Sequence, residues 1–536
     1  MQTLSTNLGT WLLALSPIVV VLVLMLGFRW GGSKAGPVGW FAAFFVSLSF
    51  FGATPEVLAY SQLKAVLLTV HVLYIIWMAL VLYNVVNEAG AIAVIGQGIA
   101  RLTNDRVMQL LILSWAFSAF LQGVAGFGVP IAVVAPLLIG MGFNPVVAVA
   151  AVAIGHSWSV TFGDIASSFQ ALIAVTGLDG RDLAPWSAIF LGLATFGCGL
   201  GAAHTFDGWR AIRRGAVAIL LMGSAMAGTQ YLLATNGLWN LAGFVAGLVG
   251  LLVGAGLARF YRRGGEEDAS TVGPGRGGER GDPGRQESAG KMGLGLALSA
   301  YLVLIVIVSA AELWPWLHNA LRAVKVEVWF PELTTTFGWT TPAGMGKAIP
   351  IFGHAGALLL YSSVIAYVIY RSAGHYTPGA LQRILTKTVR SAIPSSIGIA
   401  SMVGMAVMMA HAGMTYRLAQ GLSAAMGAAF PLVSPLIGTL GAFMTGSNTN
   451  SNVIFASLQQ RTAELVGVSI WIVLAAQTTG GALGSMLAPA KVIVGCSTAG
   501  LAGQEGQVMR KTLGYGLAIA VFVGLVAWVA IYWLGL

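Results

Sequence analysis

The sequence predicts an all-α polytopic membrane protein with about 12 to 14 transmembrane helices and two inverted repeats that contain broken helices or re-entrant hairpins. Three observations predict this class. The chain of 536 residues is 57% hydrophobic and only 9% charged, whereas soluble domains carry about 25% charged residues. Apolar runs recur from end to end. In both halves of the chain some of these runs are interrupted by segments rich in Gly, Ser and Thr and almost free of charge.

The apolar runs give the order of the expected helices. A helical span needs roughly 20 apolar residues, so the shorter runs are expected to cross only part of the bilayer. The first run has no small-residue cleavage site after it, which favours a retained helix over a removed signal. The runs cover residues 11–28, 38–52, 64–83, 110–124, 129–142, 146–163, 188–204, 215–233, 237–257, 292–311, 348–370, 391–410, 421–443, 453–460, 467–487 and 513–535.

The net charge of +10 does not indicate a nucleic-acid partner, because the basic residues lie between the apolar runs, where the positive-inside rule accounts for them. Arg29 and Lys34 follow the first run, so the N-terminus is expected outside. Glu88 and Gln97 are expected in loops. The segments expected to be cytoplasmic carry Arg210, Arg213 and Arg214; Arg259, Arg262 and Arg263; Arg371, Arg383, Lys387 and Arg390; and Arg510 and Lys511.

A hydrophilic segment divides the chain into two parts of similar size. Residues 262–291 are rich in Gly, Arg, Glu and Pro and lack apolar periodicity, which is typical of a disordered linker. We expect residues 1–261 to be an N-terminal transmembrane half with the first broken-helix repeat. Residues 292–536 are expected to be a C-terminal half with the second, since many transporters are built from inverted repeats.

Two polar breaks recur in each half. The first half contains FLQGVAGFGVPIAVVAPLL (120–138) and SWSVTFGDIASS (157–168), and the second contains GAFMTGSNTNSNVIFASL (441–458) and AQTTGGALGSMLAPAK (476–491). Irregular backbone at membrane depth is tolerated only where protein or a water-filled cavity satisfies its polar groups. TGSNTNSN (445–452) is therefore expected to be the tip between two half-helices. The alternatives are an ordinary loop here and close helix packing through GVAGFG.

The start of a helix exposes unpaired N–H donors and a positive dipole end, which suit an anion. Two broken helices, one per half, would aim such starts at one point near the midplane, as in secondary transporters that bind carboxylates. Polar side chains near the breaks would line the cavity. The residues expected to bind a small carboxylate are Gln122, Gly126, Phe127, Gly128, Ser447, Asn448, Thr449, Asn450, Ser451, Thr478, Thr479 and Gly480.

Few ionisable residues lie inside the apolar runs, where such groups are rare and mostly functional. Asp164 and His156 are the candidates for a coupling-ion or proton site, with Thr161 beside them. The alternatives are an interface position for Asp164 and a structural hydrogen bond for His156. Lys491 could attract an anion, but we expect its side chain to extend to the membrane surface.

Other classes of protein lack support in the sequence. There is no G-x-x-x-x-G-K-[ST] loop of an ATP-driven pump, no spacing of metal ligands and no recognisable catalytic frame. We therefore expect no enzyme, no resident metal and no cofactor other than a coupling proton or sodium ion. An intramembrane enzyme or a channel stays as the alternative, and turnover of substrate without accumulation would favour it.

The chain resembles the L-lactate permease family over its whole length, through FLQGVAGFGVPIAV, FDGWR (206–210), TGSNTNSNVIFASLQ, AAQTTGGALGSMLAP and GLAGQEGQVMR (500–510). The resemblance implies a bacterial inner-membrane secondary transporter of L-lactate and related 2-hydroxymonocarboxylates, such as glycolate and D-lactate, in symport with protons. It also implies kinship with the ion-transporter superfamily, whose Ser-Asn-Thr tips bind carboxylates. Ser447, Asn448 and Thr449 match that tip. The oligomeric state stays open.

Three motifs depart from the family pattern. The family usually reads FLEGAAGFG where this chain has Gln122, TGSDTSSN where it has Asn448 and Asn450, and GGVTGKM where it has Ser485. Two acids and one base are thus neutralised together, which fits the cost of leaving one buried charge without its partner. The departures make proton coupling and the substrate open questions. Asp164 and His156 become the candidates to carry the coupling, and sodium coupling with another small organic anion is the alternative.

Overall fold

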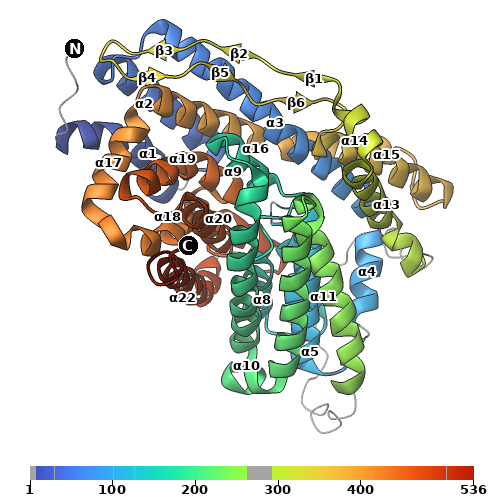
Figure 1. Ribbon diagram of the computed structural model, residues 1–536. Helices are drawn as coiled ribbons and strands as arrows, with labels where there is room; N and C mark the ends of the chain where they lie inside the picture. Colours follow the sequence, from blue (N-terminus) through green and yellow to red (C-terminus); the bar gives the residue numbers. More distant parts are fainter. Residues whose placement is uncertain are drawn as a thin grey trace.

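Helices dominate the structure, a computed structural model that describes residues 8–28, 30–100, 102–124, 126, 128–261, 292–501 and 504–536 (Figure 1). Among these residues, nine helices are long and apolar enough to cross a membrane, and four apolar helices of 10–17 residues accompany them. The all-α polytopic class is thus confirmed. The predicted linker 262–291 and the predicted site residue Phe127 lie outside the described residues.

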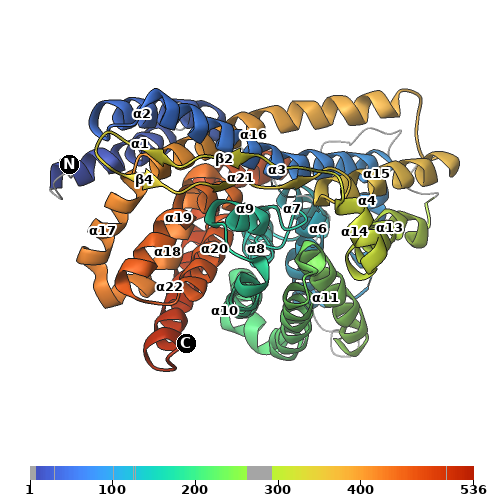
Figure 2. The ribbon, with the colours of Figure 1, turned by 45° about the horizontal axis from the view of Figure 1, so that its top comes forward.

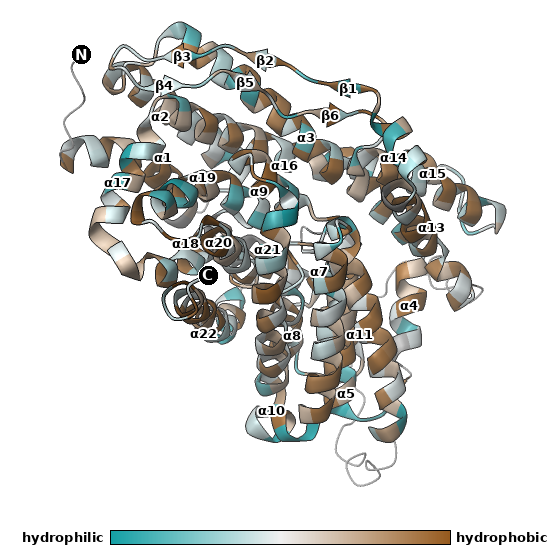
Figure 3. Ribbon diagram, viewed as in Figure 1, coloured by the Kyte–Doolittle hydropathy of each residue, from teal (hydrophilic) through white to brown (hydrophobic). Residues whose placement is uncertain are grey.

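The N-terminal half follows the predicted order of helices. Its elements are α1 (Leu8–Leu26), α2 (Gly32–Phe50), α3 (Pro55–Glu88), α4 (Ala91–Ala100), α5 (Arg106–Leu110), the π-helix η1 (Leu111–Phe117), α6 (Ser118–Val124), α7 (Val129–Gly140), α8 (Pro145–Ser157), α9 (Ser167–Thr176), α10 (Gly180–Thr235) and α11 (Trp239–Tyr261). The 56 residues of α10 form two helical segments, because the backbone leaves helical geometry at Asp207 and Gly208. The exposed polar ends of helices such as α10 contrast with their apolar bodies (Figure 3).

The C-terminal half adds long helices and one element that the sequence analysis missed. Its helices are α13 (Leu294–Leu313), α14 (Pro315–Arg322), α15 (Ala355–Ser372), α16 (Ala380–His411), α17 (Met414–Met426), the 3-10 helix η3 (Gly427–Ala429), α18 (Phe430–Thr445), α19 (Asn448–Val466), α20 (Ile470–Gly484), α21 (Pro489–Thr498) and α22 (Glu505–Tyr532).

The missed element is a β ribbon between α14 and α15. Three antiparallel ladders of two residues per strand pair in succession: β1 (Lys325–Val326) with β6 (Ile349–Pro350), β2 (Trp329–Phe330) with β5 (Gly344–Met345), and β3 (Leu333–Thr334) with β4 (Thr340–Thr341). The ribbon follows α3 lengthwise (Figures 1 and 2). Thr336 N donates to the Gly52 carbonyl at 2.9 Å, and the Tyr74 hydroxyl donates to the Ile351 carbonyl at 3.3 Å.

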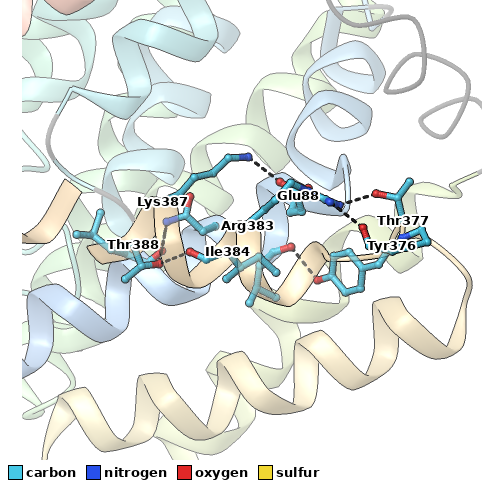
Figure 4. A network of polar contacts seen from close by, with 11 residues as sticks. Glu88, Tyr376, Thr377, Arg383, Ile384, Lys387 and Thr388 are labelled. Carbon is cyan, nitrogen blue, oxygen red and sulfur yellow. Dashed lines mark hydrogen bonds and ion pairs between the residues drawn. The ribbon is translucent and has the colours of Figure 1, made fainter. Parts of the chain in front are cut away.

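Glu88 and Gln97 are not loop residues, and this expectation was wrong. Gln97 lies within α4, and Glu88 is the last residue of α3. The Glu88 carboxylate is 7% exposed and accepts from Arg383 Nε and Lys387 Nζ of α16, at 2.7 Å each (Figure 4). A lone acid at a helix C-terminus opposes the helix dipole, so the two cations of α16 compensate its charge. This network joins α3 to α16.

The two halves share an order of helices and breaks around the predicted site. In the first half, α6, a break, α7, α8, a second break and α9 follow one another, and α18, α19, α20 and α21 repeat the pattern. The helix that follows the first break in each half packs on the helix that follows the second break of the other half. Helix α7 thus packs on α21, and α19 packs on α9. This interlocking brings the four breaks into one region. The inversion of the repeats stays a prediction.

Candidate functional site

The TGSNTNSN segment forms a hairpin tip, as predicted. Helix α18 ends at Thr445, and Gly446 turns the chain with a φ of +72°, which glycine adopts without steric cost. Ser447 is the N-cap of α19, and its side chain accepts from Asn450 N at 3.4 Å. The five residues from Asn448 to Asn452 are all buried. An ordinary solvent-facing loop is therefore excluded.

Side chains of this second tip bind the break between α8 and α9. Asn448 Nδ2 donates to Thr161 Oγ1 at 3.0 Å, and Thr161 Oγ1 donates to the Thr478 carbonyl of α20 at 3.1 Å. Asn452 Nδ2 donates to Thr478 Oγ1 at 2.9 Å and to the Ser168 carbonyl at 3.0 Å. These bonds join three helices through neutral groups. A side chain at position 481 would bring its Cβ into collision with Asn448 Oδ1, which explains why this position is a glycine.

Two predicted ligands, Ser451 of the second tip and Gly480 of α20, make close contacts with neighbouring helices. Ser451 Oγ donates to the Gly438 carbonyl at 2.8 Å and accepts from Gln477 Nε2 at 3.1 Å, which ties α19 to α18 and α20. A Cβ on Gly480 would collide with the Pro435 carbonyl. Gly480 therefore provides close packing of α20 on α18. The assignment of Gly480 and Ser451 as substrate ligands stays a prediction.

The first tip also has the predicted geometry. Gly128 is the N-cap of α7 with a φ of +85°, and Pro130 follows in the first helical turn, where its missing N–H costs nothing. A Cβ placed on Gly126 would lie 3.3 Å from Asp164 Oδ2. The described contacts therefore join the first tip to the α8–α9 break, as they do the second tip. The prediction that the two tips aim at one point stays a prediction, and both tips contact the α8–α9 break.

The α8–α9 break has a strained backbone. Asp164, Ile165 and Ala166 have φ values of +50°, +51° and +58°, a conformation that is unusual outside glycine and abnormal for a β-branched residue. It is held by backbone bonds to the end of α6: Asp164 N donates to the Gln122 carbonyl at 2.7 Å and Ile165 N to the Gly123 carbonyl at 3.1 Å. Strain of this kind concentrates at functional sites.

This strain gives a stability prediction. The left-handed conformation costs a non-glycine residue about 1–2 kcal/mol, and glycine avoids this cost. The free energy of unfolding of the Ala166→Gly variant should therefore exceed that of the Ala171→Gly variant by about that amount. Ala171 is equally buried but lies within α9. Unfolding of the purified variants in detergent measures the difference. Equal destabilisation by the two substitutions would contradict the strained break.

Lys491 does not lie where we expected it from the sequence. Its side chain does not reach the membrane surface, because Lys491 is only 6% exposed in the first turn of α21. A Cβ on Gly128 would lie 3.9 Å from Cα and Cγ of Lys491, so the lysine stem lies against the first tip. The charges of Lys491 and Asp164 interact. A buried base thus compensates the buried acid across the first tip.

The other predicted residues lie close to this region. His156 is fully buried in α8 and its Nδ1 lies 2.7 Å from the Val152 carbonyl, so Nδ1 carries the proton and donates. Gln122 is buried in the last turn of α6, and Thr479 is buried in α20. Thr449 Oγ1 lies 3.1 Å from Ser168 Oγ. Asn452, Ser168 and Gln477 were not among the predicted site residues, although all three belong to the polar breaks that the sequence displays.

Buried polar atoms without a hydrogen-bond partner among the described residues gather around the breaks. Such atoms are costly and uncommon in folded proteins. Most of those here are oxygens that accept hydrogen bonds. They include Gln122 Oε1, His156 Nε2, Asp164 Oδ1, Asn448 Oδ1, Asn450 Oδ1, Asn452 Oδ1, Thr479 Oγ1 and Ser485 Oγ. The arrangement can receive a small ligand that offers hydrogen-bond donors or a positive charge, beside a lysine that attracts an anion.

The chain is similar in sequence to known permeases. The sequence model of the family described as L-lactate permease matches residues 10–534. The L-lactate permease of Salmonella typhimurium is 28% identical over 86% of this chain and 84% of its own length. The glycolate permease GlcA of Escherichia coli is 26% identical over 97% of this chain and 95% of its own length. The L-lactate permease of Bacillus subtilis is 28% identical over 84% and 83%. Among solved structures, the YdaH transporter of Alcanivorax borkumensis has a TM-score of 0.45 at 17% identity, covering 85% of this chain and 84% of its own.

Proposed function

Because the chain belongs to the L-lactate permease family, we propose that it carries L-lactate and related small 2-hydroxymonocarboxylates by symport with protons. The chain is a multi-pass transporter of the bacterial inner membrane and not an enzyme. The observation that carries the finer proposal is the set of unpartnered buried oxygens at the breaks, beside the buried Asp164 and Lys491. A 2-hydroxy acid offers one negative carboxylate and one hydroxyl donor, and both have complements here.

The carboxylate end of the substrate belongs at the first tip in this proposal. The Lys491 ammonium supplies positive charge, and the start of α7 at Gly128 adds the positive end of a helix dipole. Glycines at 126 and 128 leave room for a ligand to approach the backbone. The lysine would then exchange its interaction with Asp164 for one with the substrate.

The hydroxyl end of the substrate belongs at the second tip. The amide oxygens of Asn448, Asn450 and Asn452 are buried and accept no hydrogen bond among the described residues. A substrate hydroxyl can donate to one of them, and a carboxylate without a hydroxyl cannot. Rejection of an analogue that leaves buried polar groups unpaired is a strong source of selectivity. This supports 2-hydroxy acids over simple acids of the same size.

Asp164 is the proposed proton carrier. Its Oδ2 accepts from Ser167 Oγ at 3.2 Å, while Oδ1 has no partner in the described part of the chain. When the substrate carboxylate takes over Lys491, the Asp164 carboxylate loses its compensating charge and gains a proton in its place. Binding of the anion and of the proton are thereby linked.

Radiolabelled L-lactate uptake into proteoliposomes tests the proposal. An acidic exterior should drive accumulation inside, with an upper limit of about tenfold per pH unit for one proton per lactate. A protonophore should abolish it. Propionate, which lacks the hydroxyl, should compete less well than glycolate. No accumulation by correctly folded protein under a proton or a sodium gradient would refute the lactate assignment.

Sodium coupling is a second candidate, favoured by one observation. The unpartnered amide and hydroxyl oxygens of Asn448, Asn450, Asn452 and Thr479, together with the Asp164 carboxylate, are the ligand type that hard cations prefer. Accumulation driven by a sodium gradient at equal pH on both sides would support it. The same assay therefore decides between the two coupling ions.

A further inference from the structure

A cavity of about 620 Å³ lies under the β ribbon, away from the breaks. Its walls come from α3, the ribbon, α16 and the C-terminal parts of α9 and α19. A neighbouring cavity of about 710 Å³ shares Ile173, Leu178, Lys347 and Ala348 with it. We call the first cavity the basic vestibule and define it by Lys64, Ile173, Val175, Thr341, Lys347, Val453, Ser457 and Arg461.

The charges of the basic vestibule have one sign. Lys64, Lys347 and Arg461 line it, and no Asp or Glu is among its lining residues. Arg461 is bound to Glu464 at 2.8 Å outside the cavity, and Lys64 Nζ lies 5.9 Å from the centre of the Phe330 ring. Lys347 is half-buried and has no hydrogen bond or ion pair in the part of the chain that the structure describes. Burial lowers the pKa of Lys347, so a bound anion would favour its charged form.

The positive-inside rule does not explain these cations. The ribbon lies between α13 and α15, and each of these helices is a candidate span. The linker before α13 and Arg371 at the end of α15 are both expected to be cytoplasmic, so the ribbon is expected on the opposite side. Basic residues on the outer side need another reason, and a cavity that concentrates them points to an anionic ligand.

A continuous seam links the basic vestibule to the second tip. At the vestibule, Ser457 Oγ of α19 donates to the Val175 carbonyl of α9 at 3.1 Å. At the tip, Ser168 Oγ of α9 lies 3.1 Å from Thr449 Oγ1 of α19. The two helices thus run side by side between the two places. Eight residues of α19 separate Thr449 from Ser457, a length of about 12 Å.

We propose that the basic vestibule is a second, outer anion-binding site that captures small carboxylates before they reach the breaks. The identity of the anion as a 2-hydroxymonocarboxylate rests on the proposed function. Lys347 is the residue that contacts the anion, since it faces both cavities. Lys64 raises the local anion concentration, as walls of one charge do in other clefts, whereas the charge of Arg461 is compensated by Glu464. The seam between α9 and α19 then leads toward Asn448.

A reporter cysteine tests this site without transport. In a chain whose two cysteines are replaced (Cys198→Ala, Cys496→Ala), Thr341→Cys places one thiol in the vestibule wall. The protein is reconstituted in phosphatidylcholine vesicles and treated with a sulfonate-bearing or a trimethylammonium-bearing methanethiosulfonate reagent. The anionic reagent should react on the order of tenfold faster than the cationic one, and added L-lactate should slow it. High salt should remove the difference.

Variants that remove single charges show which residues cause the preference for the anionic reagent. Lys347→Gln should lower the anion preference several-fold, and Lys64→Gln should lower it less. Lys511→Gln removes the same charge at an exposed position of α22 and should leave the preference unchanged. In transport, Lys347→Gln should raise KM for L-lactate at low ionic strength and leave kcat unchanged. An increase in KM that persists at high salt would instead indicate a structural defect.

The outcomes separate the proposals. Equal rates for the two reagents, or a preference that Lys347→Gln leaves intact, would overturn the outer site. Loss of lactate protection when anionic phosphatidylglycerol is included would overturn it in favour of a lipid headgroup site. Failure of L-lactate transport with an intact anion preference would refute the proposed function alone. Protection by L-lactate that survives in Asn448→Ala would support an outer site independent of the tips.

Discussion

Replacing Asp164 with Asn is expected to abolish the accumulation of L-lactate under a pH gradient while preserving exchange of internal for external lactate. The amide keeps the shape of the carboxylate and can still accept from Ser167 Oγ, which donates at 3.2 Å in the native chain. It cannot carry a proton across the membrane. Accumulation should fall to the external concentration, and counterflow of labelled lactate should continue, since exchange needs no net proton movement.

Two further variants keep this prediction decisive. Loss of one partner of a buried charge pair leaves the other charge uncompensated and destabilises the fold, so Asp164→Asn is compared with the double variant Asp164→Asn and Lys491→Gln. The double variant should recover stability but not accumulation. Asp207→Asn, at the exposed break of α10, should transport normally. Accumulation by Asp164→Asn at the native level would remove Asp164 from the coupling mechanism.

Replacing Asn448 with Ala is expected to slow both accumulation and exchange strongly. Its side chain holds Thr161 Oγ1 at 3.0 Å and places an unpartnered amide oxygen in the site. Without the Asn448 amide the substrate hydroxyl is left buried without an acceptor, which costs about 1–3 kcal/mol, so kcat/KM for L-lactate should fall on the order of 10- to 100-fold. Initial rates of uptake and of counterflow measure the loss.

The control for this variant makes the same chemical change elsewhere. Asn236 caps α10 at an exposed position, where its Nδ2 donates to the Leu232 carbonyl at 2.8 Å. Asn236→Ala should transport at the native rate. If Asn448→Ala retained more than half of native exchange while unfolding normally, the second tip would not bind substrate.

Most of the fold and both tips could be predicted because their causes are local. Apolar runs fix the spans, and Gly446 with Ser447 or Gly128 with Pro130 are the residues that a turn into a new helix requires. These signals lie within a few residues of one another. Asp164 could be selected for a similar reason, since a lone acid inside an apolar run is rare.

What the sequence could not predict depends on contacts between distant segments. The strands of the β ribbon are only two residues long, so no alternation of useful length marks them. Lys491 looks like a residue at a helix end, and only the packing of α21 on α7 shows that its stem is enclosed. The role of Gly480 follows from the carbonyl of Pro435, which the sequence places on another helix.

The presence of one buried acid, Asp164, and one buried base, Lys491, has an electrical consequence. The residues of the second tip are uncharged, and the two buried charges beside the first tip, Asp164 and Lys491, sum to zero. Binding of one monocarboxylate and one proton adds no net charge. The net charge of the binding region is therefore zero both when it is empty and when it is occupied. Movement of one charge would involve about 2.3 kcal/mol per 100 mV, and the proposed symport of one proton with one lactate would avoid that term in both directions. Under this proposal the membrane voltage neither drives nor opposes uptake, and the proton gradient alone sets the limit of lactate accumulation.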